Sequence, residues 1–247
     1  MLLPVLTPSF YATCGRSTPT FAHVHPALGA DGTFSLRLNS PTADPDNQDA
    51  ATAVPLPWTY FLFGQVLLNG QTALSEARAV LTASGTAPNA PVTPDPAGTD
   101  GRVVKYFRAD GTPGTFGDEY QVTLTDSQPS GMINLDFHIT EKMAMGGGEP
   151  MYMPVTDLQP WLGMTGHAIL ISAAGDTADQ KVFRPIHAGM GDGASMAGMP
   201  PMPGGSTGPD LMFMLMRAGM VPHGVYKIWC QTRRDDRVYA FTFVVSL

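Results

Sequence analysis

Short stretches of alternating apolar and polar residues run along most of this 247-residue chain. Residues 132–140 are the clearest example, because Ile133, Leu135, Phe137 and Ile139 occupy every second position and polar residues lie between them. A period of two places one set of side chains in a core and the other set in water. The pattern therefore predicts an antiparallel strand with one buried face.

Comparable strand patterns recur elsewhere in the chain. Residues 32–38 alternate, residues 58–68 form an apolar run rich in aromatics, and residues 167–172 follow a glycine-rich turn. Residues 225–231 and 238–245 flank the segment Arg-Arg-Asp-Asp-Arg. Two strand-like runs on either side of a short charged segment predict a hairpin with a charged tip.

One segment, residues 73–81, also fits a helix, although its last residues fit a strand equally well. Charged residues make up only 14% of the chain, which holds 27 Gly and 23 Pro. That composition disfavours long surface helices and favours short strands joined by turns. We therefore predict an all-β chain of antiparallel β-sandwich modules.

The chain also repeats itself, which suggests two related modules. Residues 21–26 (FAHVHP) are echoed by residues 183–188 (FRPIHA), and each segment precedes an alternating strand, an aromatic strand that ends in Gln, and a last strand. We predict a partial sandwich module in residues 1–82 that lacks the leading strands, a linker in residues 83–101, and a complete module in residues 102–247.

Composition argues against several classes of partner. The formal net charge is −7, whereas a nucleic-acid partner would require a basic surface. No run of 18 apolar residues occurs, so we expect no membrane span. The first residues lack a basic region and Pro4 interrupts their apolar stretch, so we expect no signal peptide in the chain.

Enzyme signatures are missing as well. The sequence contains no G-x-S-x-G, no phosphate-binding loop and no H-E-x-x-H, which favours a non-enzymatic protein. Cys14 and Cys230 are too few for a disulfide framework. We expect two unpaired, buried thiols, with a single bridge between them as the alternative.

Four histidines are candidate metal ligands. His23 and His25 lie two residues apart on a predicted strand, so their side chains point the same way from Cα atoms about 6–7 Å apart. His167 opens an apolar strand and His187 precedes a loop rich in Gly, Met and Pro; the two meet if their strands pair. Imidazoles placed together in this way can share a metal ion. The alternative in both cases is a histidine that is solvated or hydrogen-bonded beside a turn.

Methionines concentrate in the second half, since thirteen of the 15 fall between Met143 and Met220. Thioethers are soft ligands that suit Cu(I). The loop of residues 189–209 has no core to fill, so its methionines are either metal ligands or flexible apolar surface. The candidate methionine ligands are Met164, Met190, Met196 and Met199.

Three further methionines follow a different pattern. Met212, Met214 and Met216 alternate with apolar residues on a predicted strand, so we expect them to pack in the core or at an interface. His138 is expected to be solvated on the polar face of its strand, and His223 to lie in a turn.

Three segments carry a resemblance to a known family. They are residues 154–167 (PVTDLQPWLGMTGH), the HVHP segment at residues 23–26 and the GVYKIWCQ segment at residues 224–231. Together they resemble the signature of bacterial exported β-sandwich proteins that are often found with copper or heavy-metal handling genes. The resemblance covers roughly residues 21–68 and 122–247. It implies two immunoglobulin-like or copper-carrier-like antiparallel β-sandwich modules and a periplasmic or extracellular location.

The chain departs from that family in its histidines. Modules of the family tend to offer three, whereas the second copy here has Pro185 in place of one, and residues 3–12 of the first copy hold none. We expect a non-catalytic copper-binding or copper-carrier protein of an exported compartment, with copper as its one cofactor. The alternative is a structural or protein-interaction module without metal, whose Met-rich face meets another protein.

Overall fold

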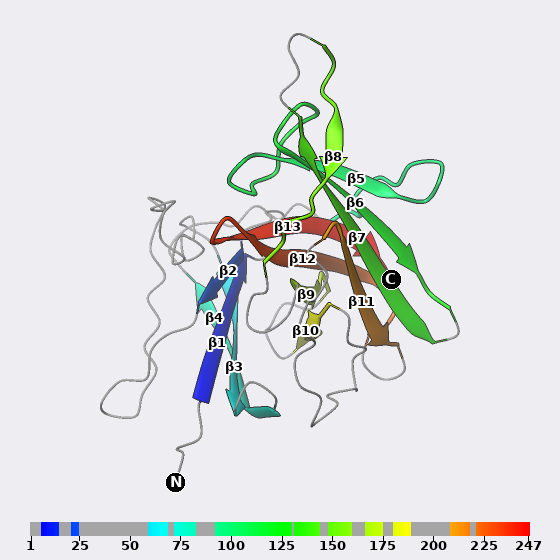
Figure 1. Cartoon of the computed structure of the whole chain (residues 1–247). Coiled ribbons are helices and arrows are strands. Elements are labelled where there is room, and N and C mark those ends of the chain that lie inside the picture. The colour runs from blue at the N-terminus through cyan, green and yellow to red at the C-terminus, as the bar shows by residue number, and fades with distance from the viewer. Residues whose placement is uncertain are drawn as a thin grey trace. The chain divides into compact units, whose positions relative to one another are not determined.

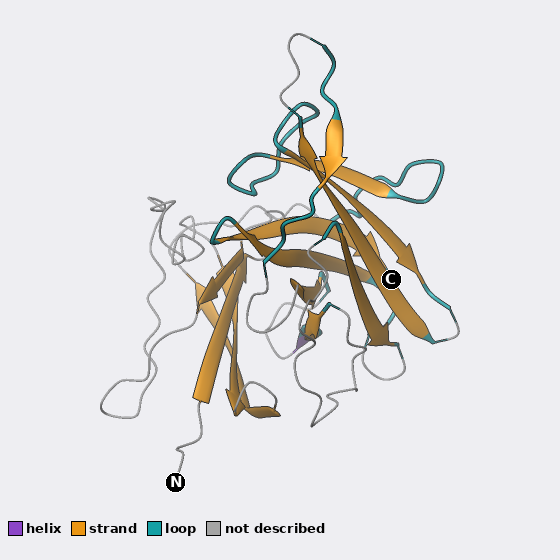
Figure 2. Ribbon diagram, viewed as in Figure 1, coloured by secondary structure: helices purple, strands orange, loops and turns teal. Residues whose placement is uncertain are grey.

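The computed structural model describes most of the second half of the chain and four strands of the first half. The described residues are 6–14, 21–24, 59–68, 72–82, 92–129, 131–143, 148–159, 166–174, 180–188, 208–217 and 221–247, the first four ranges as backbone alone. Every named element among them is a β-strand (Figures 1 and 2), so the prediction of an all-β chain is confirmed. None of these residues belongs to a helix able to cross a membrane.

The chain divides into two compact units. Unit 1 comprises Met1–Val92 and Ala173–Lys181, and unit 2 comprises Thr93–Ser172 and Val182–Leu247. Unit 1 contains one antiparallel sheet of order β2-β1-β3-β4, formed by β1 (Leu6–Cys14), β2 (Phe21–Val24), β3 (Thr59–Leu68) and β4 (Thr72–Thr82). The candidate helix at residues 73–81 is therefore a strand.

Unit 2 contains two antiparallel sheets. The first has the order β10-β9-β12-β13 and is formed by β9 (Gly166–Ser172), β10 (Phe183–His187), β12 (Val225–Arg234) and β13 (Arg237–Ser246). The second has the order β11-β7-β6-β5, with β8 paired to β7, and is formed by β5 (Val103–Phe107), β6 (Tyr120–Ser127), β7 (Met132–Lys142), β8 (Tyr152–Pro154) and β11 (Asp210–Met216).

The two sheets of unit 2 pack face to face over one apolar core. The predicted buried face of β7 is confirmed, since its four apolar residues are each at most 1% exposed: Ile133, Leu135, Phe137 and Ile139. Rings from opposite sheets meet in this core, and the centroids of Phe137 and Phe243 lie 5.4 Å apart. Unit 2 is thus a β-sandwich, while its narrower immunoglobulin-like classification stays a prediction.

The final hairpin has the predicted charged tip. Asp235 and Asp236 connect β12 to β13 with φ angles of 49° and 59°. Two successive residues of positive φ form the turn whose twist matches that of paired strands, and Asp tolerates this conformation. Arg233 adds an ion pair of 2.8 Å to Asp236.

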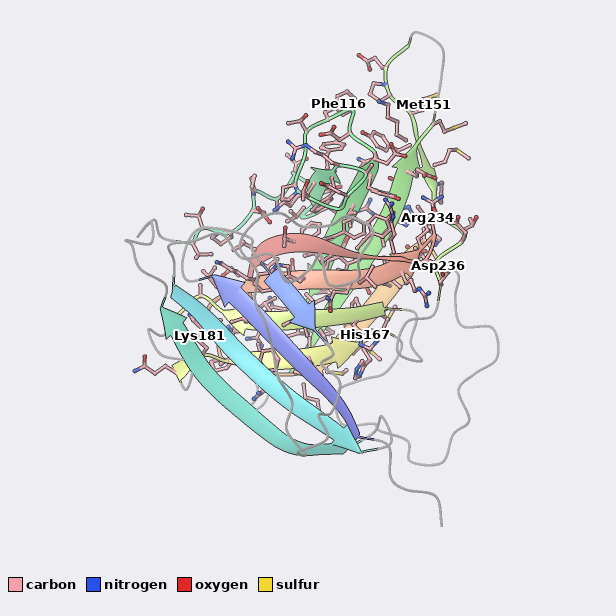
Figure 3. All side chains as sticks on the ribbon, turned by 90° about the vertical axis from the view of Figure 1, so that its left-hand side faces the viewer. Phe116, Met151, His167, Lys181, Arg234 and Asp236 are labelled. Atoms are coloured by element: carbon pink, nitrogen blue, oxygen red, sulfur yellow. The ribbon has the colours of Figure 1, made fainter. Side chains whose placement is uncertain are left out.

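Arg234 ties the segment before β9 to this hairpin (Figure 3). Its guanidinium lies 2.7 Å from Glu141 and 2.8 Å from Asp157, and it also donates to the Tyr120 hydroxyl. The carboxylate of Glu141 raises the pKa of Arg234 above its ordinary value. Residues of the PVTDLQ segment are therefore held beside the tip, where the backbone N–H of Gln159 donates to the Arg233 carbonyl at 2.7 Å.

Part of the predicted linker is attached to unit 2. The backbone N–H of Asp95 donates to the Val244 carbonyl, and the Asp95 carboxylate accepts from the Val244 N–H and pairs with Lys105 at 2.9 Å. The linker and module boundaries stay predictions, since residues 83–91 lie outside the described part of the chain. The predicted strand at residues 32–38 lies outside it as well.

Of the two roles predicted for Met212, Met214 and Met216, core packing is wrong, and packing at an interface stays a prediction. The core side of β11 is formed by Leu211, Phe213 and Leu215, each at most 1% exposed. Met212 and Met216 point into water and are 52% and 48% exposed. Both faces of β11 are apolar, so its sequence pattern could not identify the buried one.

Candidate functional site

Strand pairing brings His167 and His187 together. They are direct cross-strand partners in the β9–β10 pair. Their ring centroids lie 4.7 Å apart and the ring planes are nearly perpendicular, at 85°. Two residues that are 20 positions apart in sequence thus form one imidazole pair. The pair lies at the end of β9 where Figure 3 labels His167.

This pair lies on the face of its sheet that is turned away from the sandwich core. Ala168 and Ile186, the next residues along β9 and β10, belong to the core, so His167 and His187 point outwards. His167 is nevertheless only 7% exposed. This outward surface of β10-β9-β12-β13, the histidine face, carries the side chains of His167, Ile169, Ile171, Phe183, Pro185, His187, Lys227, Trp229, Gln231, Ala240, Thr242 and Val244.

Gln231 is the third member of the row, and the sequence analysis did not single it out as a site residue. It lies opposite His167 in the β9–β12 pair and is 2% exposed. Its side-chain oxygen has no hydrogen-bond partner among the described residues. The row His187–His167–Gln231 therefore combines two imidazoles with one unsatisfied amide oxygen. Only the register of the strands could have revealed it.

The other predicted ligands are not brought to this pair by any described contact. His23 lies on β2, in unit 1, opposite Tyr11, and its side chain is outside the described part. His25, Met164, Met190, Met196 and Met199 also lie outside the described residues. Within those residues, no three side chains of His, Cys, Asp or Glu form a group able to hold a metal ion.

The remaining titratable groups of unit 2 support the predicted roles in part. His138 is 43% exposed as expected, but its ring also pairs with Asp210 at 2.7 Å. The ring of His223 lies 3.1 Å from the guanidinium of Arg217. Cys230 is free and fully buried, and burial raises the pKa of its thiol, so it is unreactive rather than bridged to Cys14.

A second group of polar side chains lies on the outward face of the other sheet. Asp136, His138 and Asp210 line a groove of about 320 Å³ there. Burial and, less strongly, the charge of Asp210 raise the pKa of Asp136. This face was predicted to be solvated. The alternation of a strand identifies its outer positions but does not predict that residues of neighbouring strands form a groove there.

Comparison with known proteins identifies the family of residues 115–247. A family model described as a domain of unknown function, DUF8832, matches residues 115–247, which is more than half of the chain. No curated protein matches the chain at a significant level.

Proposed function

The chain belongs to the DUF8832 family, and we propose that this member binds copper as a non-catalytic carrier, with His167 and His187 as ligands. The single observation that carries the proposal is the imidazole pair, with ring centroids 4.7 Å apart. Two imidazoles that bind one ion at about 2 Å and meet at a roughly tetrahedral angle have ring centres about 5 Å apart. The spacing therefore needs little adjustment on binding.

The surroundings of the pair favour a soft or borderline metal ion. Neutral imidazole is a good ligand for copper and zinc, and both histidines are backed by paired strands that restrict their positions. Gln231 offers an amide oxygen on the same row. The preference for copper rests on the methionines of residues 189–209, which follow His187 directly in sequence.

An exported compartment is the second part of the proposal. It is supported by the resemblance of residues 154–167 to exported β-sandwich proteins associated with copper handling. The internal repeat also supports the resemblance to these proteins. The sheet of unit 1, in the order β2-β1-β3-β4, has the same chain-order connectivity as the sheet β10-β9-β12-β13 of unit 2. The two sheets differ at one equivalent cross-strand pair. Gln65 on β3 lies opposite Ser9, whereas Gln231 on β12 lies opposite His167. In the repeat that we propose, Ser9 therefore stands where the second copy has His167.

Copper titration of the metal-free chain tests the proposal, with Cu(I) measured against a competing chelator and Cu(II) by absorbance. We expect sub-micromolar binding that weakens at least about 100-fold in His167→Ala/His187→Ala, since both ligands are lost. His138→Ala/His223→Ala is the matched control, because it removes two histidines outside the pair. Affinity in the unmodified chain should also fall at acidic pH, because ligating imidazoles must be neutral.

His187→Ala alone completes the experiment, because His187 is less buried than His167 and its replacement disturbs the sheet less. Equal binding by this variant and the unmodified chain would overturn the proposal. A second candidate function, a protein-interaction module without metal, is supported by the exposure of Met212 and Met216. The titration separates the two functions, because a metal-free module binds no more copper than the His167→Ala/His187→Ala variant does.

A further inference from the structure

A row of methionines occupies the outward face of the β11-β7-β6-β5 sheet. Met132 is 36% exposed, Met216 is 48% exposed and Met212 is 52% exposed, while Met214 is half-buried between them. The term methionine face is used below for this surface of β7 and β11, whose side chains are Met132, Asn134, Asp136, His138, Asp210, Met212, Met214 and Met216.

Neither strand propensity nor packing accounts for methionine at these positions. Strands favour β-branched and aromatic residues, and the water-facing side of a sandwich strand favours polar ones. Met132 occupies such a water-facing position on β7, where Asn134, Asp136 and His138 follow the polar pattern. Methionine differs from a generic apolar residue by its thioether sulfur, which is a soft metal ligand.

Strand register assembles three of these thioethers. Met216 lies directly opposite Met132, so their Cβ atoms are about 4.5–5.5 Å apart. Met214 is two residues along β11 on the same face, about 7 Å from Met216, and lies diagonal to Met132. Flexible side chains at these spacings can direct three sulfurs to one point. Met212 lies about 13 Å along β11 from Met216, which is too far for the two to share one ion.

Two side-chain oxygens on the methionine face also lack a hydrogen-bond partner among the described residues. The amide nitrogen of Asn134 donates to Ser127 on β6, and the side-chain oxygen of Asn134 is buried without a hydrogen-bond partner among the described residues. One carboxylate oxygen of Asp136 is in the same condition. Asn134 lies opposite Met214, and Asp136 lies opposite Met212. A cation held by Met132 and Met214 would lie beside Asn134 and would compensate its oxygen, whereas Asp136 lies next to Met212 and outside the site.

We propose that Met132, Met214 and Met216 form a thioether site for a soft monovalent cation, Cu(I) or its chemical analogue Ag(I). Three neutral sulfurs suit such an ion, and they keep it bound at a pH at which histidine ligands are protonated. The site does not depend on the proposed role of His167 and His187. The histidine face and the methionine face belong to different sheets of unit 2 and point away from the shared core.

Methyl resonances of methionine provide a site-specific test in the full-length chain. The chain is labelled with methyl-¹³C methionine, the signals are assigned by single Met→Leu substitutions, and Ag(I) is added in chloride-free buffer. We expect the signals of Met132, Met214 and Met216 to shift together and to saturate near one equivalent. The internal controls are Met151 and Met153 on and beside β8, which are equally exposed at 51% and 50%.

Substitution then separates sulfur chemistry from apolar surface. Met132→Leu/Met216→Leu keeps the size and apolarity of the face, and we expect Ag(I) binding at Met214 to weaken at least about tenfold. Met151→Leu/Met153→Leu should leave it unchanged. Equal shifts at all exposed methionines, or undiminished Ag(I) affinity in the first variant, would overturn the site and leave an apolar contact surface. Because the signals of the three methionines are read individually, Ag(I) binding at His167 and His187 does not affect the conclusion.

Discussion

The two outward faces of the unit 2 sandwich depart in opposite ways from the rule that apolar side chains are buried and polar ones exposed. On the histidine face, Ile169, Ile171 and Trp229 are at most 2% exposed, and the exceptions are buried polar side chains such as His167 and Gln231. On the methionine face the surroundings are polar, and the exceptions are exposed apolar side chains such as Met216. Polar groups are costly in the first setting, and large apolar groups are unnecessary in the second.

This difference shows where candidate chemistry is to be sought in an all-β chain that lacks catalytic motifs. A polar side chain in a buried strand position, or a large apolar one in an exposed position, is not explained by folding alone. Such mismatches are concentrated at functional sites. Here the mismatches are grouped by cross-strand register, His187–His167–Gln231 on one sheet and Met216–Met132 on the other. Strand register therefore places these residues side by side in two candidate metal sites, one with imidazole ligands and one with thioether ligands.

The largest expected difference between the faces is in their contribution to stability. Ile169→Ala should lower the free energy of unfolding by about 2–5 kcal/mol, because it removes a fully buried side chain. Met212→Ala should change it by less than about 0.5 kcal/mol, because its side chain is half in water. Equilibrium unfolding in urea measures both. Equal effects of the two substitutions would mean that the histidine face is as open to water as the methionine face.

A smaller effect is expected from the unsatisfied hydroxyl on the histidine face. Thr242 lies opposite Trp229, is 7% exposed, and its hydroxyl has no partner among the described residues. Thr242→Val should therefore stabilise the chain by about 1 kcal/mol. Thr140→Val is the matched control, with the opposite sign, because its hydroxyl donates to the Gln121 carbonyl at 2.9 Å. Thermal unfolding of the two variants measures the contrast, and destabilisation by Thr242→Val would contradict it.

The smallest expected effect concerns the pH dependence of the methionine face. Burial, and then Asp210, raise the folded-state pKa of Asp136 above its ordinary value of 3.8. Protonated Asp136 is therefore favoured by folding, and that stabilisation is present below pH 3.8 and is lost as pH rises through the folded-state pKa. Asp136→Asn should raise stability at pH 7 by less than about 1 kcal/mol, since solvent screens this face.

The same variant should match the unmodified chain below pH 3.8, where the carboxyl is protonated in both folded and unfolded states. Unfolding midpoints at several pH values provide the measurement. A lower midpoint for Asp136→Asn at pH 7 would show that the Asp136 charge is stabilising and that a positive group already compensates it.

Much of the described fold could be predicted from sequence because its signals are local. The alternation in residues 132–140 identified β7 and its buried side, and Arg-Arg-Asp-Asp-Arg identified the tip of the last hairpin. Local signals were insufficient where two patterns coincide. Residues 73–81 fitted helix and strand, and β11 carries apolar residues on both faces, so the burial of Leu211 rather than Met212 depended on the opposite sheet.

The candidate site was predictable only in its residue types. His167 and His187 could be named from their positions beside an apolar strand and a Met-rich loop, and their pairing was stated as a condition. Gln231 and Met132 were not predicted as site residues. Gln231 stood out only as the end of an aromatic strand, and no local pattern marks Met132. The other two predicted ligand groups were His23 with His25 and the loop methionines. The side chain of His23 and the whole of the remaining residues lie outside the described part of the chain.

The sequence by itself determined the all-β class, the strand faces with clear alternation and the supply of soft ligands. These follow from periodicity and composition, which act over a few neighbouring residues. Tertiary structure alone decided which strands pair and in what register. It thereby placed His187 opposite His167 and Met132 opposite Met216. The physical reason is that cross-strand neighbours are distant in sequence, and a shift of one residue in register would turn every one of these side chains to the other face.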